Sequence, residues 1–127
     1  MVEGDQSMNR YSKVALVGCG YWGKNLCRNF AALGALEMVV DATETGRANT
    51  RSIAPEALFS SIVEDALTNQ DIQALALATP AETHAELTIR AMELGKDVFV
   101  EKPMALTLVD AEKMKKVAEE TGSILMV

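Results

Sequence analysis

The chain alternates short apolar runs with longer amphipathic stretches. The apolar runs lie at residues 14–17, 36–40, 58–60, 72–78, 98–100 and 124–127. Largely apolar runs of this length are typical of strands that are buried on both faces of a sheet. Between them, apolar residues recur at helical spacing, which predicts helices at residues 22–33, 44–53, 61–68, 82–94 and 107–121. In the third of these helices, we expect Ile62, Val63, Ala66 and Leu67 on the buried side.

Strands that alternate with helices predict parallel βαβ units with right-handed crossovers. Six such strands are the size of one α/β domain with a doubly wound parallel sheet, the Rossmann fold, in the strand order 3-2-1-4-5-6. A chain of 127 residues is long enough for one domain of this kind. We expect residues 1–10 to form a flexible leader and residues 11–127 to form the domain. Because the chain ends inside an apolar run, we also expect it to be a fragment.

The most informative motif follows the first predicted strand directly. Gly18, Gly20 and Gly23 have the spacing G-x-G-x-x-G and stand between a strand and a helix. In this context, the first glycine allows a tight turn, the second lets the backbone approach a pyrophosphate, and the third lets helix and strand pack closely. The helix N-terminus then offers free N–H groups to the phosphates. The motif predicts a dinucleotide site, although three such glycines also occur in ordinary loops.

An acidic residue follows the second strand at the position that a dinucleotide site requires. Asp41 lies 23 residues after Gly18, close to the offset of about 20 residues at which a carboxylate binds the adenosine ribose. The alternative is a turn residue that closes the strand. A carboxylate at the ribose would repel a 2′-phosphate and so favours NAD over NADP. Arg47, which is close in sequence, leaves NADP possible.

The other candidate residues follow the later strands. In an open α/β sheet, ligands bind outside the carboxyl ends of the strands, where the strand order reverses. This rule selects Thr79 and Pro80 after the fourth strand, and Glu101 and Lys102 after the fifth. Lys102 is a candidate for moving the proton of an alcohol during hydride transfer, or is an exposed lysine at a strand end. Glu101 either binds the nicotinamide ribose or pairs with Lys102.

Further residues near these strand ends have two interpretations each. His84, in the first turn of the fourth predicted helix, either points towards the cofactor or packs at the helix start. Thr79 or Thr83 is a candidate cap for that helix. Tyr21 and Trp22 are large for a glycine turn, and they either cover the pyrophosphate or pack beneath a part of the protein that this chain lacks.

Composition narrows the range of partners. The formal net charge is -6 and no basic cluster is present, which argues against nucleic acid and against an anionic membrane surface. The apolar runs are too short to span a bilayer, and no secretory segment follows the N-terminus. Cys19 and Cys27 lack CxxC spacing and the chain has a single histidine, so we expect no disulfide framework and no metal site. These features fit a cytoplasmic protein.

Four segments together resemble the glucose-fructose oxidoreductase/inositol dehydrogenase/MocA (Gfo/Idh/MocA) family. They are G-C-G-Y-W-G after the first strand, Asp41, A-T-P-A-E-T-H at residues 78–84, and V-E-K-P-M-A-L-T at residues 100–107. The resemblance covers about residues 11–127 and implies the N-terminal NAD(P)-binding Rossmann domain of that family. The G-Y-W-G-K-N form of the turn is similar to members that act on nucleotide sugars, such as UDP-N-acetylhexosamine or hexuronate 3-dehydrogenases.

The resemblance implies a role for each candidate residue. It implies pyrophosphate binding by Gly18, Gly20 and Gly23, and ribose binding by Asp41. It places Thr79, Pro80 and His84 on the nicotinamide side. Glu101 and Lys102 would face the nicotinamide and the substrate, with Lys102 as the catalytic residue.

The resemblance also implies an activity. Family members are NAD(P)-dependent oxidoreductases that transfer hydride between the nicotinamide and a secondary alcohol of a sugar, nucleotide sugar or polyol. Their second domain supplies substrate contacts and usually the interface of a homo-oligomer. This domain is absent here, so we expect the fragment alone to be inactive. Two alternatives are a non-catalytic NAD(P)-binding sensor and an S-adenosylmethionine methyltransferase, which would need an antiparallel strand pair near its C-terminus.

Overall fold

The computed structural model describes residues 13–127, so the expected leader at residues 1–10 lies outside the described residues. The strands are β1 (Val14–Val17), β2 (Leu36–Val40), β3 (Leu58–Ser60), β4 (Ala74–Leu77), β5 (Asp97–Val100) and β6 (Leu125–Met126). The helices are α2 (Gly23–Ala32), α3 (Glu44–Ile53), α4 (Glu64–Leu67), the 3-10 helix η1 (Ala81–Thr83), α5 (His84–Glu93) and α6 (Leu108–Thr121).

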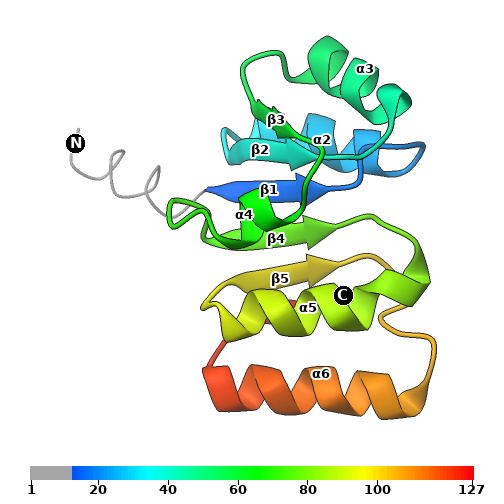
Figure 1. Cartoon of the computed structure of the whole chain (residues 1–127), viewed down its shortest axis with the longest axis vertical. Helices are drawn as coiled ribbons and strands as arrows, with labels where there is room; N and C mark the ends of the chain where they lie inside the picture. The colour runs from blue at the N-terminus through cyan, green and yellow to red at the C-terminus, as the bar shows by residue number, and fades with distance from the viewer. Residues whose placement is uncertain (1–12) are drawn as a thin grey trace.

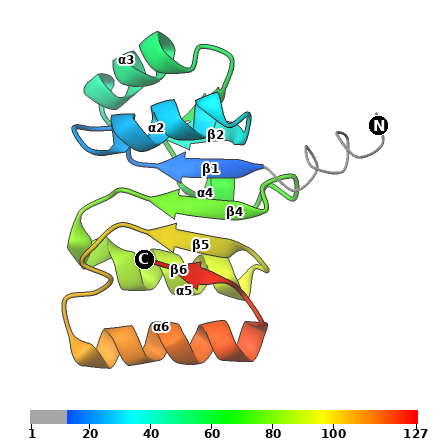
Figure 2. The same cartoon turned by 180° about the vertical axis from the view of Figure 1, so that it is seen from behind.

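The strands form one six-stranded sheet in the order β3-β2-β1-β4-β5-β6. Every strand pair in residues 13–127 is parallel, so the arrowheads in Figure 1 all point the same way. Strand β6, which is hidden in Figure 1, lies beside β5 in Figure 2. The predicted Rossmann topology is confirmed. The antiparallel pair that a methyltransferase would need does not occur in this part of the chain.

The sheet has a hydrophobic core on each face. In β1, Ala15 and Val17 pack into the core under α4, α5 and α6, whereas Leu16 packs into the core under α2 and α3. Successive strand residues point to opposite faces, and both faces are covered by helices, as the two views show (Figures 1 and 2). This arrangement explains why the strand sequences are apolar without alternation.

Two helices begin and end where the sequence predicts. The hydroxyl of Thr43 accepts a hydrogen bond from the N–H of Gly46 at 3.0 Å and so caps α3. The hydroxyl of Thr107 caps α6 in the same way, through the N–H of Asp110 at 3.1 Å. Gly122 ends α6 in a left-handed conformation with a φ of 74°.

The helix predicted at residues 61–68 is wrong in length, since α4 has only four residues. The hydroxyl of Ser60 accepts a hydrogen bond from the N–H of Ile62 at 3.0 Å and donates one to the carboxylate of Asp65 at 2.5 Å. This turn delays the start of the helix. Ile62, which was expected on the buried side, is consequently 54% exposed.

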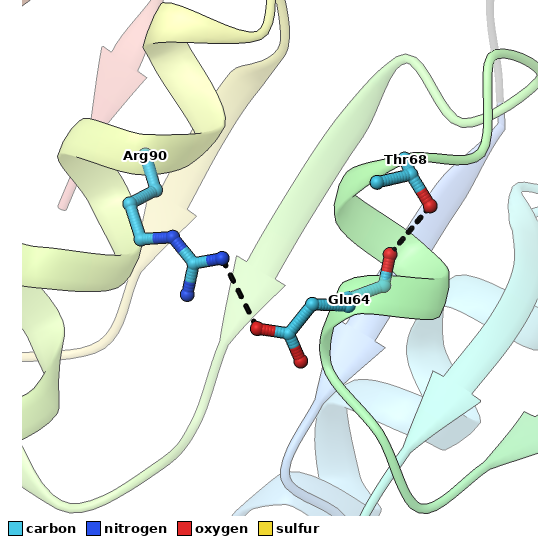
Figure 3. A network of polar contacts seen from close by, with 3 residues as sticks. All are labelled: Glu64, Thr68 and Arg90. Carbon is cyan, nitrogen blue, oxygen red and sulfur yellow. Dashed lines mark hydrogen bonds and ion pairs between the residues drawn. The ribbon is translucent and has the colours of Figure 1, made fainter.

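An ion pair joins the short helix α4 to α5. The guanidinium of Arg90 lies 3.1 Å from the carboxylate of Glu64, and the hydroxyl of Thr68 donates to the carbonyl of Glu64 at 2.7 Å (Figure 3). The hydrogen bond from Arg90 is the main reason why the pKa of Glu64 lies below its usual value. The ion pair thus links α4 to α5 on one face of the sheet.

The predicted strand at residues 72–78 and the predicted helix at residues 82–94 are also shorter in the structure. The carbonyl of Ile72 accepts from the ammonium of Lys96 at 2.8 Å instead of extending β4, and the helix opens with the 3-10 turn η1. Within residues 13–127, no helix combines the length and apolar character needed to cross a membrane.

Candidate functional site

The glycine turn after β1 is shaped by close contacts that exclude larger residues. Gly18 has a φ of 96°, and a Cβ at this position would lie 2.6 Å from the carbonyl oxygen of Ala78. A Cβ on Gly23 would overlap the carbonyl of Gly18. The N–H of Gly18 donates to the carbonyl of Val40 at 2.7 Å, which ties the turn to β2. The first and third glycines are therefore required by the packing of the turn itself.

The residue between the first two glycines is held through both of its backbone groups. The N–H of Cys19 donates to Asp41 Oδ2 at 2.7 Å. The carbonyl of Cys19 accepts a hydrogen bond from Asn49 Nδ2, on α3, at 2.8 Å. The glycine turn is thus fastened to the end of β2 and to α3. The sequence did not indicate Asn49, because its contact is tertiary and belongs to no recognised motif.

The carboxylate of Asp41 is fixed in position by its own neighbours. Asp41 Oδ1 accepts hydrogen bonds from the N–H of Thr43 at 2.7 Å and from its hydroxyl at 2.6 Å. Burial raises the pKa of Asp41, but the hydrogen bonds from Cys19 and Thr43 outweigh burial and hold this pKa below its usual value. The carboxylate is therefore charged at neutral pH. A Cβ at Gly46 would overlap it, so the first turn of α3 lies directly against the carboxylate.

A cavity of about 670 Å³, which we call the Asp41 cavity, opens at the carboxyl ends of the strands. Its lining includes Gly18, Gly20, Asp41, Thr43, Thr79 and Pro80. These residues follow three different strands of the sheet. The parallel arrangement brings all of them to one rim, which we call the carboxyl rim.

A second cavity, of about 440 Å³, lies next to the first and shares Ala78 and Thr79 with it. We call it the Lys102 cavity, and it is lined by Trp22, Ala78, Thr79, Ala81, His84, Glu101, Lys102 and Pro103. The N–H of Glu101 donates to the carbonyl of Leu77 at 3.0 Å and so continues the pairing of β4 and β5. No ion pair joins Glu101 to Lys102. The Lys102–Pro103 peptide bond is cis.

The imidazole of His84 lies between two loops of the carboxyl rim. His84 is only 1% exposed. Its Nδ1 lies 2.8 Å from the carbonyl oxygen of Pro103, and its Nε2 lies 2.9 Å from that of Thr79. The ring therefore packs at the start of α5 and also forms part of the Lys102 cavity wall.

Neither threonine that was expected to cap α5 does so. The hydroxyl of Thr83 donates to the carbonyl of Pro80 at 2.7 Å, and it lies 2.6 Å from the hydroxyl of Thr79. Both hydroxyls are thus engaged within the loop, because η1 precedes α5 and shifts its first N–H groups away from them. The expected cap is wrong, and the loop is held by its own side chains instead.

The two aromatic residues of the glycine turn are exposed. Tyr21 is 77% exposed and Trp22 is 69% exposed. Their rings pack edge to face with centroids 5.6 Å apart, and the ammonium of Lys24 lies 5.3 Å from the centre of the Tyr21 ring. Trp22 lines the Lys102 cavity. A large apolar surface therefore stands at the mouth of this cavity.

Two free cysteines lie beneath the glycine turn. Cys19 and Cys27 are both fully buried. A hydrogen bond from the thiol of Cys27 lowers the pKa of Cys19 to about 7, against the opposing effect of burial. The same contact, together with burial, raises the pKa of Cys27. Among residues 13–127, no group of three or more His, Cys, Asp or Glu residues is arranged to hold a metal ion.

A larger cavity, of about 830 Å³, lies at the opposite rim of the sheet and is lined by residues such as Lys13, Gln73 and Asp97. The ammonium of Lys96 lines it too, but this group already donates to the carbonyls of Asn69 and Ile72 at 2.9 and 2.8 Å. None of the glycine-turn residues reaches this rim. Size alone therefore does not identify the functional site.

The structure brings the residues selected from the sequence to one rim. The glycine turn and Asp41 border one cavity, Glu101 and Lys102 border the next, and Thr79 borders both. Thr43 was missed, although a threonine directly before a predicted helix is a recognisable cap. Its second contact, with Asp41, follows from the two-residue spacing that lets an acidic side chain bond the backbone ahead of it.

Comparison with known proteins identifies the family. Residues 12–127 match the model of the GFO_IDH_MocA oxidoreductase family, NAD-binding Rossmann fold. The chain is 33% identical to scyllo-inositol 2-dehydrogenase (NAD(+)) of Bacillus subtilis, over 94% of this chain and 36% of that protein. It is 32% identical to 4-carboxy-2-hydroxymuconate-6-semialdehyde dehydrogenase of a Sphingobium species, over 91% of this chain and 37% of that protein.

Solved structures agree with this family. The WlbA dehydrogenase of Chromobactrium violaceum, in complex with NADH and UDP-GlcNAcA, superposes with a TM-score of 0.80. It is 30% identical and covers 91% of this chain, which corresponds to 34% of that protein. The chain thus spans about a third of the length of the relatives that it matches. It belongs to the Gfo/Idh/MocA oxidoreductase family, as an NAD-binding Rossmann domain.

Proposed function

We propose that this chain binds the cofactor for an oxidoreductase that transfers hydride between NAD and a secondary alcohol of a sugar, nucleotide sugar or polyol. One observation carries the proposal. The Asp41 and Lys102 cavities adjoin at the carboxyl rim and share Thr79. An extended dinucleotide would occupy both, with its adenosine near Asp41 and its nicotinamide near Lys102.

The residues of the glycine turn fit a pyrophosphate. Helix α2 begins at Gly23 without a side-chain cap, and its first turn contains no acidic residue. Its N-terminus therefore keeps the partial positive charge that attracts phosphate. A Cβ added to Gly20 would meet nothing within 4 Å, so the backbone there is open to a ligand. These features support pyrophosphate binding by Gly18, Gly20 and Gly23.

The surroundings of Asp41 support a preference for NAD over NADP. The charged carboxylate would accept hydrogen bonds from the adenosine ribose hydroxyls and would repel a 2′-phosphate. Arg47 is the residue whose positive charge could bind the 2′-phosphate of NADP. Its guanidinium stacks over the ring of Phe59, 4.6 Å from the ring centre. An arginine that stacks on an aromatic ring is less available to bind a 2′-phosphate.

The Lys102 cavity would hold the reacting groups. When bound, NAD supplies the hydride acceptor, and its reduced form supplies the hydride donor. Lys102 would take the hydroxyl proton as the alcohol is oxidised and return it in the reverse direction. Glu101 would bind the nicotinamide ribose, since no ion pair with Lys102 engages its carboxylate. Trp22 would exclude water from the mouth of the cavity.

The names of relatives support the substrate class. One relative is named as an inositol dehydrogenase, and one solved neighbour holds UDP-GlcNAcA. Because the chain spans about a third of such proteins, we propose that it works with a second, substrate-binding domain, that the fragment alone is inactive, and that the complete enzyme is a homo-oligomer.

The free, buried cysteines Cys19 and Cys27 support a location in the reducing cytoplasm.

The test is a screen of the complete enzyme against sugars, UDP-sugars and polyols, with NADH formation followed by absorbance. Reduction of NAD by at least one member of these classes is expected. Tight NAD binding without turnover of any of them would favour the sensor instead. In that case substitution of Lys102 would leave the properties of the protein unchanged, because a sensor does not need a proton carrier at this position.

A further inference from the structure

His84 connects the two loops that form the walls of the Lys102 cavity. One wall is the loop after β4, which includes Thr79, and the other is the segment after β5, which includes Pro103. The ring nitrogens of His84 lie 2.9 and 2.8 Å from the carbonyl oxygens of these two residues. Both distances are those of N–H···O hydrogen bonds. The side chain is 1% exposed, so water does not replace either contact.

The chemistry of these contacts restricts the protonation state of the ring. A backbone carbonyl can only accept a hydrogen bond, whereas a neutral imidazole carries one N–H and one lone pair. A neutral His84 would satisfy one carbonyl and direct its lone pair at the other across less than 3 Å. An imidazolium carries two N–H donors and satisfies both carbonyls, with the added strength of charged donors.

We propose that His84 is a positioning residue that, as an imidazolium, donates to the carbonyls of Thr79 and Pro103 at the same time and so holds Lys102 at a fixed distance from the loop after β4. Lys102 directly precedes Pro103, so the second hydrogen bond controls the backbone from which its side chain extends. The catalytic consequence rests on the proposed role of Lys102. The protonation state of His84 and its two hydrogen bonds are independent of that role.

Among the residues that line the Lys102 cavity with His84, the charged ones lie in one segment only. Glu101 and Lys102, in the segment after β5, line the cavity together with His84. The residues contributed by the glycine turn, by the end of β4 and by η1 are uncharged, namely Trp22, Ala78, Thr79 and Ala81. The carboxylate of Glu101 is thus the one negative side chain among these lining residues that can offset the charge of an imidazolium.

The direct test is nitrogen-15 NMR on the chain of residues 1–127. His84 is the only histidine, so the spectrum contains a single pair of imidazole nitrogens. At pH 7 we expect both nitrogens to carry protons that exchange slowly with water, and we expect couplings across hydrogen bonds to the carbonyl carbons of Thr79 and Pro103. A ring with one unprotonated nitrogen at pH 7 would overturn the proposal. This measurement needs neither substrate nor turnover, so its failure is distinguishable from failure of the proposed activity.

A pair of substitutions tests the positioning role in the complete enzyme. In His84→Asn the amide nitrogen can replace Nδ1 and keep the bond to Pro103, whereas in His84→Gln it can replace Nε2 and keep the bond to Thr79. We expect kcat to fall on the order of 10-fold or more in His84→Gln and clearly less in His84→Asn, with the KM for NAD little changed in both. Equal losses of kcat in the two variants, or a loss confined to KM, would contradict the proposal.

Discussion

The backbone N–H of Cys19 donates a hydrogen bond to the carboxylate of Asp41 over 2.7 Å. This contact joins the glycine turn, which we assign to the pyrophosphate, to the carboxylate that we assign to the ribose. The glycine turn and Asp41 therefore form one structural unit, and a change in either should alter the position of the other. The hydroxyl of Thr43 completes the unit, because it bonds both Asp41 and the first turn of α3.

Removing the Thr43 hydroxyl should weaken both the fold and NAD binding. Thr43→Val keeps the shape of the side chain but loses the cap of α3 and one hydrogen bond to Asp41. We expect the free energy of unfolding to fall by about 1–2 kcal/mol, as measured by urea denaturation. Thr43→Ser retains the hydroxyl and is the matched control. A Thr43→Val protein as stable as the Ser variant would show that these hydrogen bonds contribute little.

Stability should depend on the ionisation of Asp41. Its pKa in the folded state lies below the unfolded value of about 3.9. The stabilisation is therefore fully present above the unfolded pKa and is lost as the pH falls through the folded pKa. We expect urea denaturation between about pH 5 and pH 2 to show a smaller loss of stability in Asp41→Asn than in the wild type. Parallel curves for the two proteins would argue against a depressed pKa.

Gly18→Ala should abolish NAD binding, whereas Gly34→Ala should not. Both glycines have positive φ, 96° and 73°, so each substitution costs about 1–2 kcal/mol of stability through the left-handed backbone. An added Cβ meets nothing near Gly34 but collides with the carbonyl of Ala78 at Gly18. Thermal unfolding and NADH titration of both variants separate the two effects. Equal NADH affinity in both would mean that the shape of the glycine turn is not needed for binding.

Replacing Lys102 should affect turnover far more than cofactor affinity. In the complete enzyme, we expect Lys102→Ala to lower kcat by a factor of about 10² to 10⁴, the usual contribution of a proton-transfer group. The KM for NAD should change little, because the pyrophosphate and ribose contacts lie in the other cavity. Lys102→Arg keeps the charge but cannot exchange the proton, so it should be equally impaired. An active Arg variant would show that charge, and not proton transfer, is what the reaction uses.

The strand order could be predicted from the sequence because it depends on simple physical features. Fully apolar runs such as residues 14–17 are typical of strands covered on both faces, and Gly18 and Gly23 permit a turn that other residues cannot form. The rule that ligands bind at strand carboxyl ends then brought Asp41 and Lys102 to one rim. Each of these inferences uses neighbouring residues or a general property of parallel sheets.

The remaining details depend on individual side-chain hydrogen bonds, some local and some between segments that are distant in sequence. The shortened helix α4 results from competition by the Ser60 hydroxyl, which the helical pattern of apolar residues does not reveal. The bond from Asn49 to Cys19 joins residues 30 positions apart. The two carbonyls that face His84 belong to loops that follow different strands, β4 and β5. Periodicity and motifs carry no information about such pairs.

The most direct test of the proposed site is calorimetric titration of the chain of residues 1–127 with NADH and with NADPH. We expect saturable one-to-one binding of NADH, with a Kd of about 1 μM or weaker, because the second domain that we propose would complete the cleft. NADPH should bind on the order of 10-fold more weakly, and Asp41→Asn should remove this difference. The absence of NADH binding at millimolar concentration, or equal affinity for both cofactors in the wild type, would contradict the roles given to the carboxyl rim and to Asp41.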